Sequence, residues 1–360
     1  MKKKVLVAMS GGVDSSVAAA ILLEKGYEVY GATMQIWEPI CDIDAVKEGG
    51  CCSLHAVEDA RRVANILGIP YYVFNMREEF KNTVIDYFVD EYMKGKTPNP
   101  CIMCNRKIKF ESFLKKAEML GMDFIATGHY ARIEYDENLN RFLLKKSVAD
   151  KKDQTYALYN MTQYVLSKTL YPLGDFNKEQ TREIAEKYNL PVAKKADSQE
   201  ICFVSDDDYG RFIEDATNFK EEGKYLSIDG RILGRSKSYF HYTIGQRKGL
   251  GISQGKRMYV VDINPKENVV VLGDEEHIFK DTLIARDLNF IPFDKLERPI
   301  EVNAKIRYSA KEAKAIISPI DEKSIMVKFE QKQRAITPGQ SVVFYDGDIV
   351  VGGGVIEKII

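Results

Sequence analysis

The first half of the chain alternates short apolar runs with segments of helical periodicity. Residues 5–9 predict a buried strand, and apolar positions at helical spacing over 13–23 predict the helix that follows it. Further strands are predicted at 28–34, 68–74 and 124–127, and further helices at 56–67, 78–94, 107–120 and 178–188. Because strands that alternate with helices usually pair in parallel, we expect an α/β fold with a doubly wound parallel sheet.

Two local signals refine these boundaries. Pro98 and Pro100 interrupt the helical pattern, so residues 95–106 are expected to be irregular. Asn177 and Gln180 have the spacing of a capping pair, which predicts that the helix over 178–188 begins there.

The pattern changes after residue 205. One helix is predicted at 208–216, and beyond it short alternating strands follow one another with glycine-containing turns between them. Short strands at this spacing are typical of a small antiparallel barrel. We therefore expect three domains: a catalytic parallel-sheet domain over 1–205, a central β-rich domain over 206–277 and a C-terminal β-barrel over 278–360.

A glycine-containing turn joins the first strand to the first helix, and it reads Ser10-Gly11-Gly12-Val13-Asp14-Ser15-Ser16. Glycines allow an anion to approach the backbone, the first-turn amides of a helix lack an intrahelical acceptor, and the helix dipole favours negative charge there. The turn is therefore a predicted phosphate site, and the Asp14 carboxylate is placed to help hold magnesium. No lysine follows the glycines, so the Walker pattern is not met.

This turn resembles the pyrophosphate-binding loop (PP-loop) of the ATP-pyrophosphatase superfamily. Members of that superfamily split ATP into AMP and pyrophosphate and adenylate a substrate oxygen, on a fold like that of the adenine nucleotide alpha-hydrolases. A simpler interpretation is a turn capped by Ser10, which accounts for a glycine but not for the whole heptad after the first strand.

Composition limits the remaining choices. The 52 basic and 53 acidic residues give a formal net charge of −1, so any RNA site must be a local patch. No apolar run is long enough for a membrane span, and the basic start is followed by too short an apolar run for a secretory signal, so we expect a cytoplasmic protein. Six cysteines in that compartment favour thiol chemistry or metal binding over a disulfide scaffold.

Cys101 and Cys104 form a CxxC pair, which is compatible with a zinc half-site, a redox pair, iron–sulfur ligands or simple packing. A structural zinc would need two more ligands, and the vicinal pair Cys51 and Cys52 is poorly suited to chelation. Arg106 and Lys107 follow Cys104 directly, where positive charge would lower the pKa of its thiol.

Seven motifs together resemble the bacterial tRNA-specific 2-thiouridylase family, in the family's order and across nearly the full chain. They are the heptad at 10–16, TPNPCIMCN at 97–105, TGHY at 127–130, KDQ at 152–154, DSQEICF at 197–203, TIGQRKGLG at 243–251 and TPGQ at 337–340.

The resemblance implies the activity and the site residues. Cys104 would be the nucleophile and Cys202 the carrier of a persulfide sulfur. ATP contacts are implied for Ala8, Met9, Ser10, Gly11, Gly12, Val13, Asp14, Ser15, Met34 and Gly128. Contacts to the target base are implied for Asn99, Pro100 and Cys101, and contacts to tRNA for His129, Lys152, Asp153, Gln154, Arg307, Tyr308 and Gln340.

The implied chemistry is consistent. The 2-carbonyl oxygen of the wobble uridine is a poor leaving group, and adenylation by ATP with magnesium converts it into AMP. Persulfide sulfur from Cys202 then replaces the AMP group on the 2-carbon. Cys104 and Cys202 end as a disulfide that a reductant must reopen. A cysteine desulfurase or a sulfur-relay protein would supply the sulfur, and the anticodon stem-loop would present the extruded base.

One departure from the family pattern leaves an alternative open. Many members carry aspartate where this chain has Cys101. Cys101, Cys104 and Cys202 could instead hold a [4Fe-4S] cluster with one open iron that binds sulfide. Two further rivals are an amide ligase that adenylates a carboxylate and an RNA-binding protein without catalytic activity.

Overall fold

The computed structural model describes residues 2–36, 54–149, 152–195, 201–204, 206, 208–252 and 255–360. These residues divide into two compact units. Unit 1 comprises Met1–Ile85, Cys101–Asp207 and Asp348–Val350, and unit 2 comprises Asp86–Pro100, Asp208–Gly347 and Val351–Ile360. In the part of the chain that the structure describes, no helix is long and apolar enough to cross a membrane.

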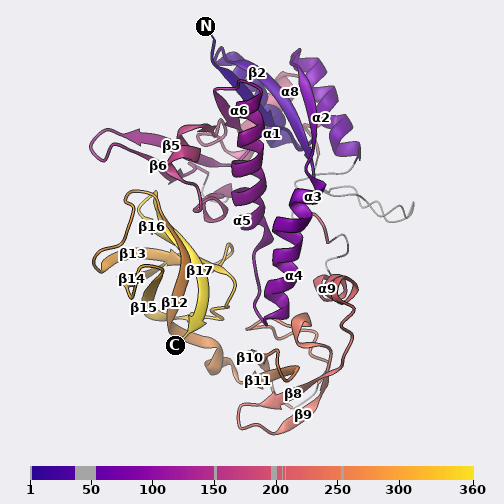
Figure 1. The fold of residues 1–360 in the computed structure, drawn as a ribbon, viewed down its shortest axis with the longest axis vertical. Helices are drawn as coiled ribbons and strands as arrows, with labels where there is room; N and C mark the ends of the chain where they lie inside the picture. The colour runs from indigo at the N-terminus through magenta and orange to yellow at the C-terminus, as the bar shows by residue number, and fades with distance from the viewer. Residues whose placement is uncertain are drawn as a thin grey trace. The chain divides into compact units, whose positions relative to one another are not determined.

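A parallel sheet forms the centre of unit 1 (Figure 1). Its strand order is β3-β2-β1-β4-β7, and every pairing is parallel. The strands are β1 (Lys4–Ala8), β2 (Glu28–Gln35), β3 (Tyr71–Asn75), β4 (Phe124–Ala126) and β7 (Thr169–Leu170). The predicted doubly wound parallel sheet is confirmed, and its first strand lies at the centre.

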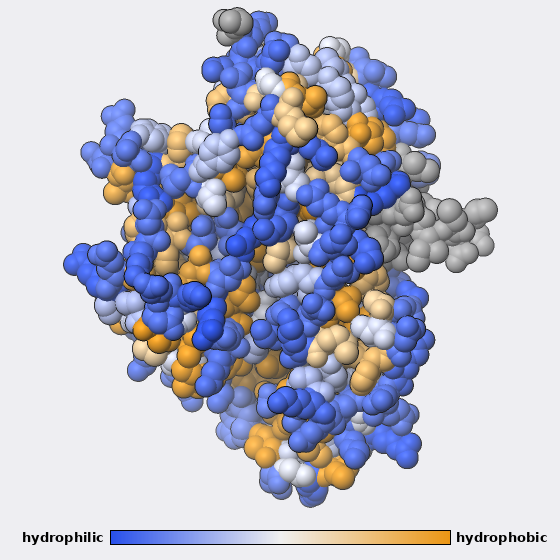
Figure 2. Space-filling view, in the orientation of Figure 1, coloured by the Kyte–Doolittle hydropathy of each residue, from blue (hydrophilic) through white to orange (hydrophobic). Residues whose placement is uncertain are grey.

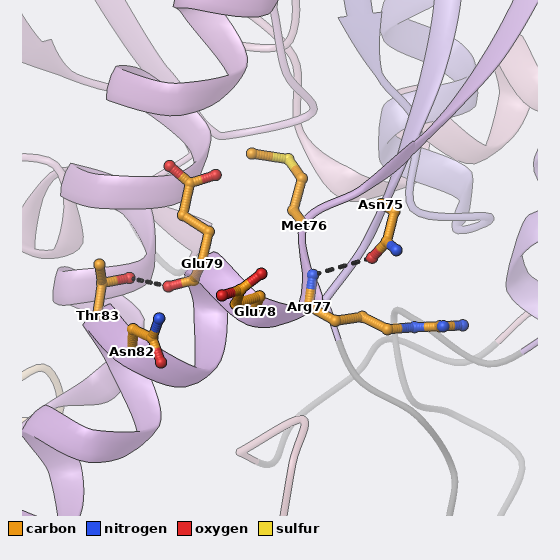
Figure 3. Close-up of a pocket in the computed structure, with 7 residues that line it drawn as sticks. All are labelled: Asn75, Met76, Arg77, Glu78, Glu79, Asn82 and Thr83. Carbon is orange, nitrogen blue, oxygen red and sulfur yellow. Dashed lines mark hydrogen bonds between the residues drawn. The ribbon is translucent and has the colours of Figure 1, made fainter.

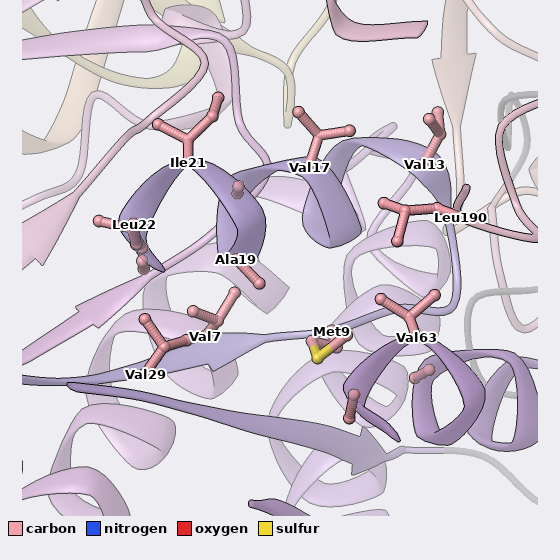
Figure 4. Close-up of a cluster of buried hydrophobic side chains, with 14 of the residues drawn as sticks. Val7, Met9, Val13, Val17, Ala19, Ile21, Leu22, Val29, Val63 and Leu190 are labelled. Carbon is pink, nitrogen blue, oxygen red and sulfur yellow. The ribbon is translucent and has the colours of Figure 1, made fainter. Parts of the chain in front are cut away.

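Helices cover both faces of this sheet. On one face, Val7 of β1 and Met9 just beyond it pack against α1 (Val13–Glu24), α2 (Leu54–Leu67) and α8 (Lys178–Lys187) in a buried cluster (Figure 4). Burying each large aliphatic side chain of this kind stabilises the fold by roughly 1.5–3 kcal/mol. This core holds the start of α1 rigidly at the carboxyl end of β1.

On the other face, α6 (Phe113–Met119) places the Phe113 ring 6.0 Å from the Phe74 ring of β3. Its buried residues face the sheet, and Figure 2 shows mainly hydrophilic residues along its outer side. The helix is therefore amphipathic, as its sequence periodicity predicts.

The two long helices predicted at 78–94 and 107–120 contain π-helical segments. The first consists of α3 (Arg77–Phe80), η1 (Lys81–Ile85) and α4 (Asp86–Met93). The second begins earlier than predicted, with α5 (Pro100–Cys104), η2 (Asn105–Ser112) and then α6. The expectation of irregular chain through residue 106 is wrong from Pro100 onward, because proline is compatible with the first position of a helix.

Smaller elements complete unit 1. They are the hairpin β5 (Ala131–Asp136) and β6 (Arg141–Lys146), the 3-10 turn η4 (Thr155–Ala157) and α7 (Gln163–Ser167). The predicted capping pair is confirmed: the Asn177 side chain accepts from the Gln180 amide, and the Gln180 side chain accepts from the Asn177 amide.

Unit 2 contains α9 (Tyr209–Thr217), a small sheet and a closed antiparallel barrel (Figure 1). The small sheet has the order β10 (Tyr259–Asn264), β11 (Val269–Gly273), β8 (Gly223–Ser227) and β9 (Ile232–Ser236). The barrel has the order β12 (Phe279–Phe290), β15 (Ser324–Arg334), β14 (Ala313–Pro319), β13 (Ile300–Lys305), β16 (Ser341–Asp346) and β17 (Ile349–Ile359). Pairing of β12 with β17 closes it, so the predicted C-terminal barrel is confirmed.

Candidate active site

The heptad forms a tight loop at the carboxyl end of β1. Gly11 has a φ of +69°, and Gly12 is the extended N-cap of α1. Inside the loop, the Ser10 amide donates to the Ser15 hydroxyl oxygen (3.2 Å), and the Ser16 hydroxyl donates to the Gly12 carbonyl (2.8 Å). The predicted strand, turn and helix are all present, and the amides of the first helical turn are presented as an anion site requires.

Two glycines allow neighbouring elements to approach this loop. A Cβ on Gly11 would lie 2.3 Å from the carbonyl oxygen of Ala56 in α2. A Cβ on Gly128, just beyond β4, would lie 2.6 Å from the amide nitrogen of Ser15. The sheet thus brings Gly128 beside the loop although more than a hundred residues separate them in sequence.

Strand β2 supplies the third side. The hydroxyl of Thr33, next to the predicted ATP contact Met34, donates to the carbonyl oxygen of Met9 (2.6 Å). The residues predicted to contact ATP therefore gather at the carboxyl ends of the three adjacent strands β2, β1 and β4, which is where open α/β sheets bind ligands.

A lysine from a distant helix lies beside the loop. Lys178, the first residue of α8, contacts both carboxylate oxygens of Asp14 (2.8 and 3.0 Å). The Tyr130 hydroxyl donates to the same carboxylate (2.9 Å). The loop lacks the lysine of a Walker motif, and this contact provides a positive charge next to it. Sequence reasoning located the start of α8 but missed this role, because the proximity depends on the tertiary packing of α1 and α8.

The three described cysteines differ in exposure. Cys104, the last residue of α5, is buried, whereas Cys101 and Cys202 are exposed. The residue after Cys202, Phe203, packs edge-on against Phe80 of α3 with the ring centres 5.7 Å apart. Lys107, expected to act on the Cys104 thiol, forms an ion pair with Glu111 (3.0 Å).

Within the described residues, no three His, Cys, Asp or Glu side chains are grouped closely enough to hold a metal ion. The described thiols thus do not form the three-ligand set that a cluster would need. The pair Cys51 and Cys52, interpreted above as poorly suited to chelation, lies outside the described residues. Asn105, directly after Cys104, donates to the Ala157 carbonyl oxygen (2.9 Å), which fixes the start of the π-helical turn.

A cavity of about 550 Å³ opens after β3 (Figure 3). It is lined by Asn75, Met76, Arg77, Glu78, Glu79, Asn82 and Thr83. The Glu78 and Glu79 carboxylates bring negative charge to this cavity, and the Arg77 side chain extends away from Glu79. A phosphate would be repelled by the two carboxylates, so the glycine loop is the better anion site in unit 1.

In unit 1, the residues predicted to contact tRNA also stabilise the structure around the loop. The Gln154 side chain accepts from the amide of Tyr130 (3.1 Å), and Asp153 accepts from the amide of Ser147 (3.2 Å). The neighbouring Lys152 is half-buried. Gln154 therefore supports Tyr130, whose hydroxyl contacts Asp14.

In unit 2, Gln340 holds the segment that precedes Asn99 and Pro100, because its side-chain amide donates to the carbonyl oxygen of Thr97 (2.7 Å). Arg307 donates to the carbonyl oxygen of Arg334 (2.7 Å). Tyr308 is 48% exposed, and Lys305 Nζ lies 5.8 Å from the centre of its ring, so an aromatic surface and a positive charge lie together there.

His129 is half-buried and packs against two aromatic rings. The ring centres of Phe110 and Tyr171 lie 6.0 Å from its own, and its Nδ1 lies 2.7 Å from the Thr127 hydroxyl. Burial, and to a lesser degree the charge of Lys109, lowers the pKa of His129 well below its usual range. The neutral imidazole is therefore the form that the folded protein favours.

This shift predicts a pH dependence of stability. The unfolded chain protonates His129 near its ordinary pKa of about 6.5, whereas the folded chain resists protonation, so the free energy of unfolding falls as the pH drops below about 6.5. His129→Asn should lose less stability than the wild type between about pH 7.5 and about pH 5.5 in urea titrations. His277→Asn, at an exposed site, is the control, and parallel profiles for wild type and His129→Asn would contradict the assignment.

The first domain is an α/β domain with a phosphate-binding loop. Its class is defined by the parallel sheet, the glycine loop at the central strand and the adjacent lysine. Three family models match consecutive parts of the chain. They are described as the tRNA methyl transferase HUP domain (residues 3–206), the tRNA methyl transferase PRC-barrel domain (residues 210–274) and the aminomethyltransferase beta-barrel domain (residues 280–356).

Curated relatives match over their full length. A "tRNA-specific 2-thiouridylase MnmA" of Caldicellulosiruptor saccharolyticus is 71% identical over 358 residues, with 99% of each chain covered. Proteins of the same name from Acetivibrio thermocellus and Clostridioides difficile are 62% and 60% identical, again with 99% of each chain covered. The chain belongs to the tRNA-specific 2-thiouridylase family.

Proposed function

We propose that this chain uses ATP to replace the 2-oxygen of the wobble uridine in tRNA with sulfur, giving 2-thiouridine. The observation that carries the proposal is the 71% identity to a tRNA-specific 2-thiouridylase over 99% of both chains. A glycine loop and separate buried and exposed thiols support it, because the reaction needs both a phosphate site and a pair of sulfur-transfer groups.

The first step activates the base. The loop amides and Lys178 would hold the phosphates of ATP, with adenine near Met34 and Gly128, and Asp14 would hold magnesium through carboxylate oxygens of the kind this ion prefers. Asp14 already accepts from Lys178 and Tyr130, so these partners orient its carboxylate. The uridine 2-oxygen attacks the α-phosphorus, pyrophosphate leaves, and the 2-carbon becomes joined through oxygen to AMP.

The second step transfers sulfur. The terminal sulfur of a Cys202 persulfide bonds to the 2-carbon while the carbon–oxygen bond to AMP breaks. The Cys104 thiolate then attacks Cys202 Sγ, the sulfur–sulfur bond breaks to leave sulfur on the base, and a Cys104–Cys202 disulfide forms. A dithiol reductant then reduces this disulfide to two thiols and is itself oxidised to a disulfide. The exposure of the two thiols supports these roles: exposed Cys202 is accessible to a sulfur-donor protein, and buried Cys104 is shielded from premature oxidation.

The remaining predicted residues would bind the RNA. Asn99, Pro100 and Cys101 would contact the extruded base. Residues 1–205 would carry the chemistry, while the central domain over 206–277 and the barrel over 278–360 would hold the anticodon stem-loop. A cysteine desulfurase or sulfur-relay protein would load Cys202.

The test is mass spectrometry of nucleosides from unmodified tRNA incubated with the protein, ATP, magnesium, a cysteine desulfurase, cysteine and a dithiol. We expect 2-thiouridine at the wobble position, dependent on ATP and accompanied by one AMP per modified base. Absence of the thiolated nucleoside under both aerobic and anaerobic conditions would refute the proposal.

A further inference from the structure

A second distant lysine contacts the loop directly. Lys195 Nζ donates to the carbonyl oxygen of Gly11 (3.1 Å) and forms an ion pair with Asp59 Oδ2 of α2 (2.8 Å). Both charged side chains are mostly buried, with exposed fractions of 34% for Lys195 and 24% for Asp59. None of the sequence motifs or expected ATP contacts includes either residue.

The backbone that carries Lys195 is itself anchored. Two nitrogens of the Arg182 guanidinium, from α8, donate to the carbonyl oxygens of Ala193 (2.8 Å) and Lys195 (3.2 Å). The base of the lysine is thus held by α8, and its ammonium group is held by α2. Lys195 therefore connects α8, α2 and the glycine loop.

This contact determines the orientation of one peptide group. In a planar trans peptide, the carbonyl of one residue and the N–H of the next point in opposite directions. Lys195 attracts the Gly11 carbonyl to one side of the loop, and so the Gly12 N–H must point to the other side. Gly11 and Gly12 have no side chains to restrict this peptide, so its orientation depends on contacts such as the one with Lys195.

We infer that Lys195 is a positioning residue for the nucleotide: it holds the Gly11–Gly12 peptide so that the Gly12 N–H faces the bound phosphates. This inference rests on the proposed use of ATP. We assign Lys195 to the backbone of the loop because its ammonium group contacts the Gly11 carbonyl oxygen and Asp59. Asp59 in turn keeps the ammonium group in place.

The test measures binding of ATP and of adenosine by calorimetry, with magnesium and without tRNA. We expect Lys195→Met to raise the Kd for ATP about tenfold, as the loss of one charge-assisted hydrogen bond would, and to leave the Kd for adenosine unchanged. Lys195→Arg should recover part of the loss. The adjacent exposed Lys194→Met is the matched control and should bind ATP like the wild type.

The variant Asp59→Asn distinguishes a Lys195 that positions the loop from a Lys195 that contacts a phosphate directly. A lysine that touched phosphate would be released by this change, and the loss of a nearby negative charge would leave ATP binding equal or tighter. A positioning lysine loses its anchor instead, so ATP binding should weaken several-fold. Equal ATP affinity in Lys195→Met and Lys194→Met, or equal losses for ATP and adenosine, would overturn the inference. A wild-type protein that does not bind ATP would refute the proposed function instead.

Discussion

Cys202→Ser is expected to abolish formation of 2-thiouridine, a loss of at least about a thousandfold, because a serine hydroxyl cannot carry a transferable sulfur. Release of pyrophosphate in the presence of ATP and tRNA should persist in this variant, since the proposed adenylation step uses the glycine loop and not the thiol. Nucleoside mass spectrometry and a pyrophosphate assay measure the two steps separately. Full thiolation by Cys202→Ser would contradict the sulfur assignment.

Cys101→Asp is the matched control for this experiment. Cys101 is exposed, as Cys202 is, so neither substitution should disturb the core. If sulfur travels as a persulfide on Cys202, Cys101 carries no sulfur, and thiolation should continue in Cys101→Asp. If three cysteines held an iron–sulfur cluster, removal of this ligand would abolish thiolation. Iron analysis of anaerobically purified wild type and Cys101→Asp completes the comparison.

Gly11→Ala is expected to weaken ATP binding strongly and to lower the stability of unit 1. The backbone φ of +69° is unfavourable for alanine, at a cost of about 1–3 kcal/mol, and the new methyl group would lie 2.3 Å from the carbonyl oxygen of Ala56. The loop must then move away from α2, and the Gly11 carbonyl loses its contact with Lys195. We expect the Kd for ATP to rise by more than about a hundredfold, because several loop amides move together.

Gly68→Ala provides a control with nearly the same backbone conformation. Gly68 has a φ of +67°, but a Cβ there would meet nothing within 4 Å. Its substitution should incur the conformational cost alone and leave ATP binding intact. Thermal unfolding and calorimetric titration with ATP measure both effects. ATP affinity that falls equally in the two variants would show that close packing on α2 is not the cause.

Local sequence was sufficient wherever a local pattern controls the conformation. The apolar run before the heptad, the two glycines and the capping pair at Asn177 and Gln180 determine where strands and helices start. Alternating apolar residues likewise predicted the barrel, because its strands each place one face in the core. The proline rule failed at Pro100, where the position within the helix decided the outcome and not the residue type.

The amino-acid sequence by itself determined the strand, loop and helix of the phosphate site and the motifs that associate the chain with its family. The tertiary structure decided which side chains surround that loop. Lys178 lies 164 residues from Asp14, and Lys195 lies 184 residues from Gly11. Local periodicity carries no information about such contacts, because they depend on the strand order of the sheet and on the helices packed against it. The same packing buries Cys104 and leaves Cys202 exposed, a difference that residue type cannot encode.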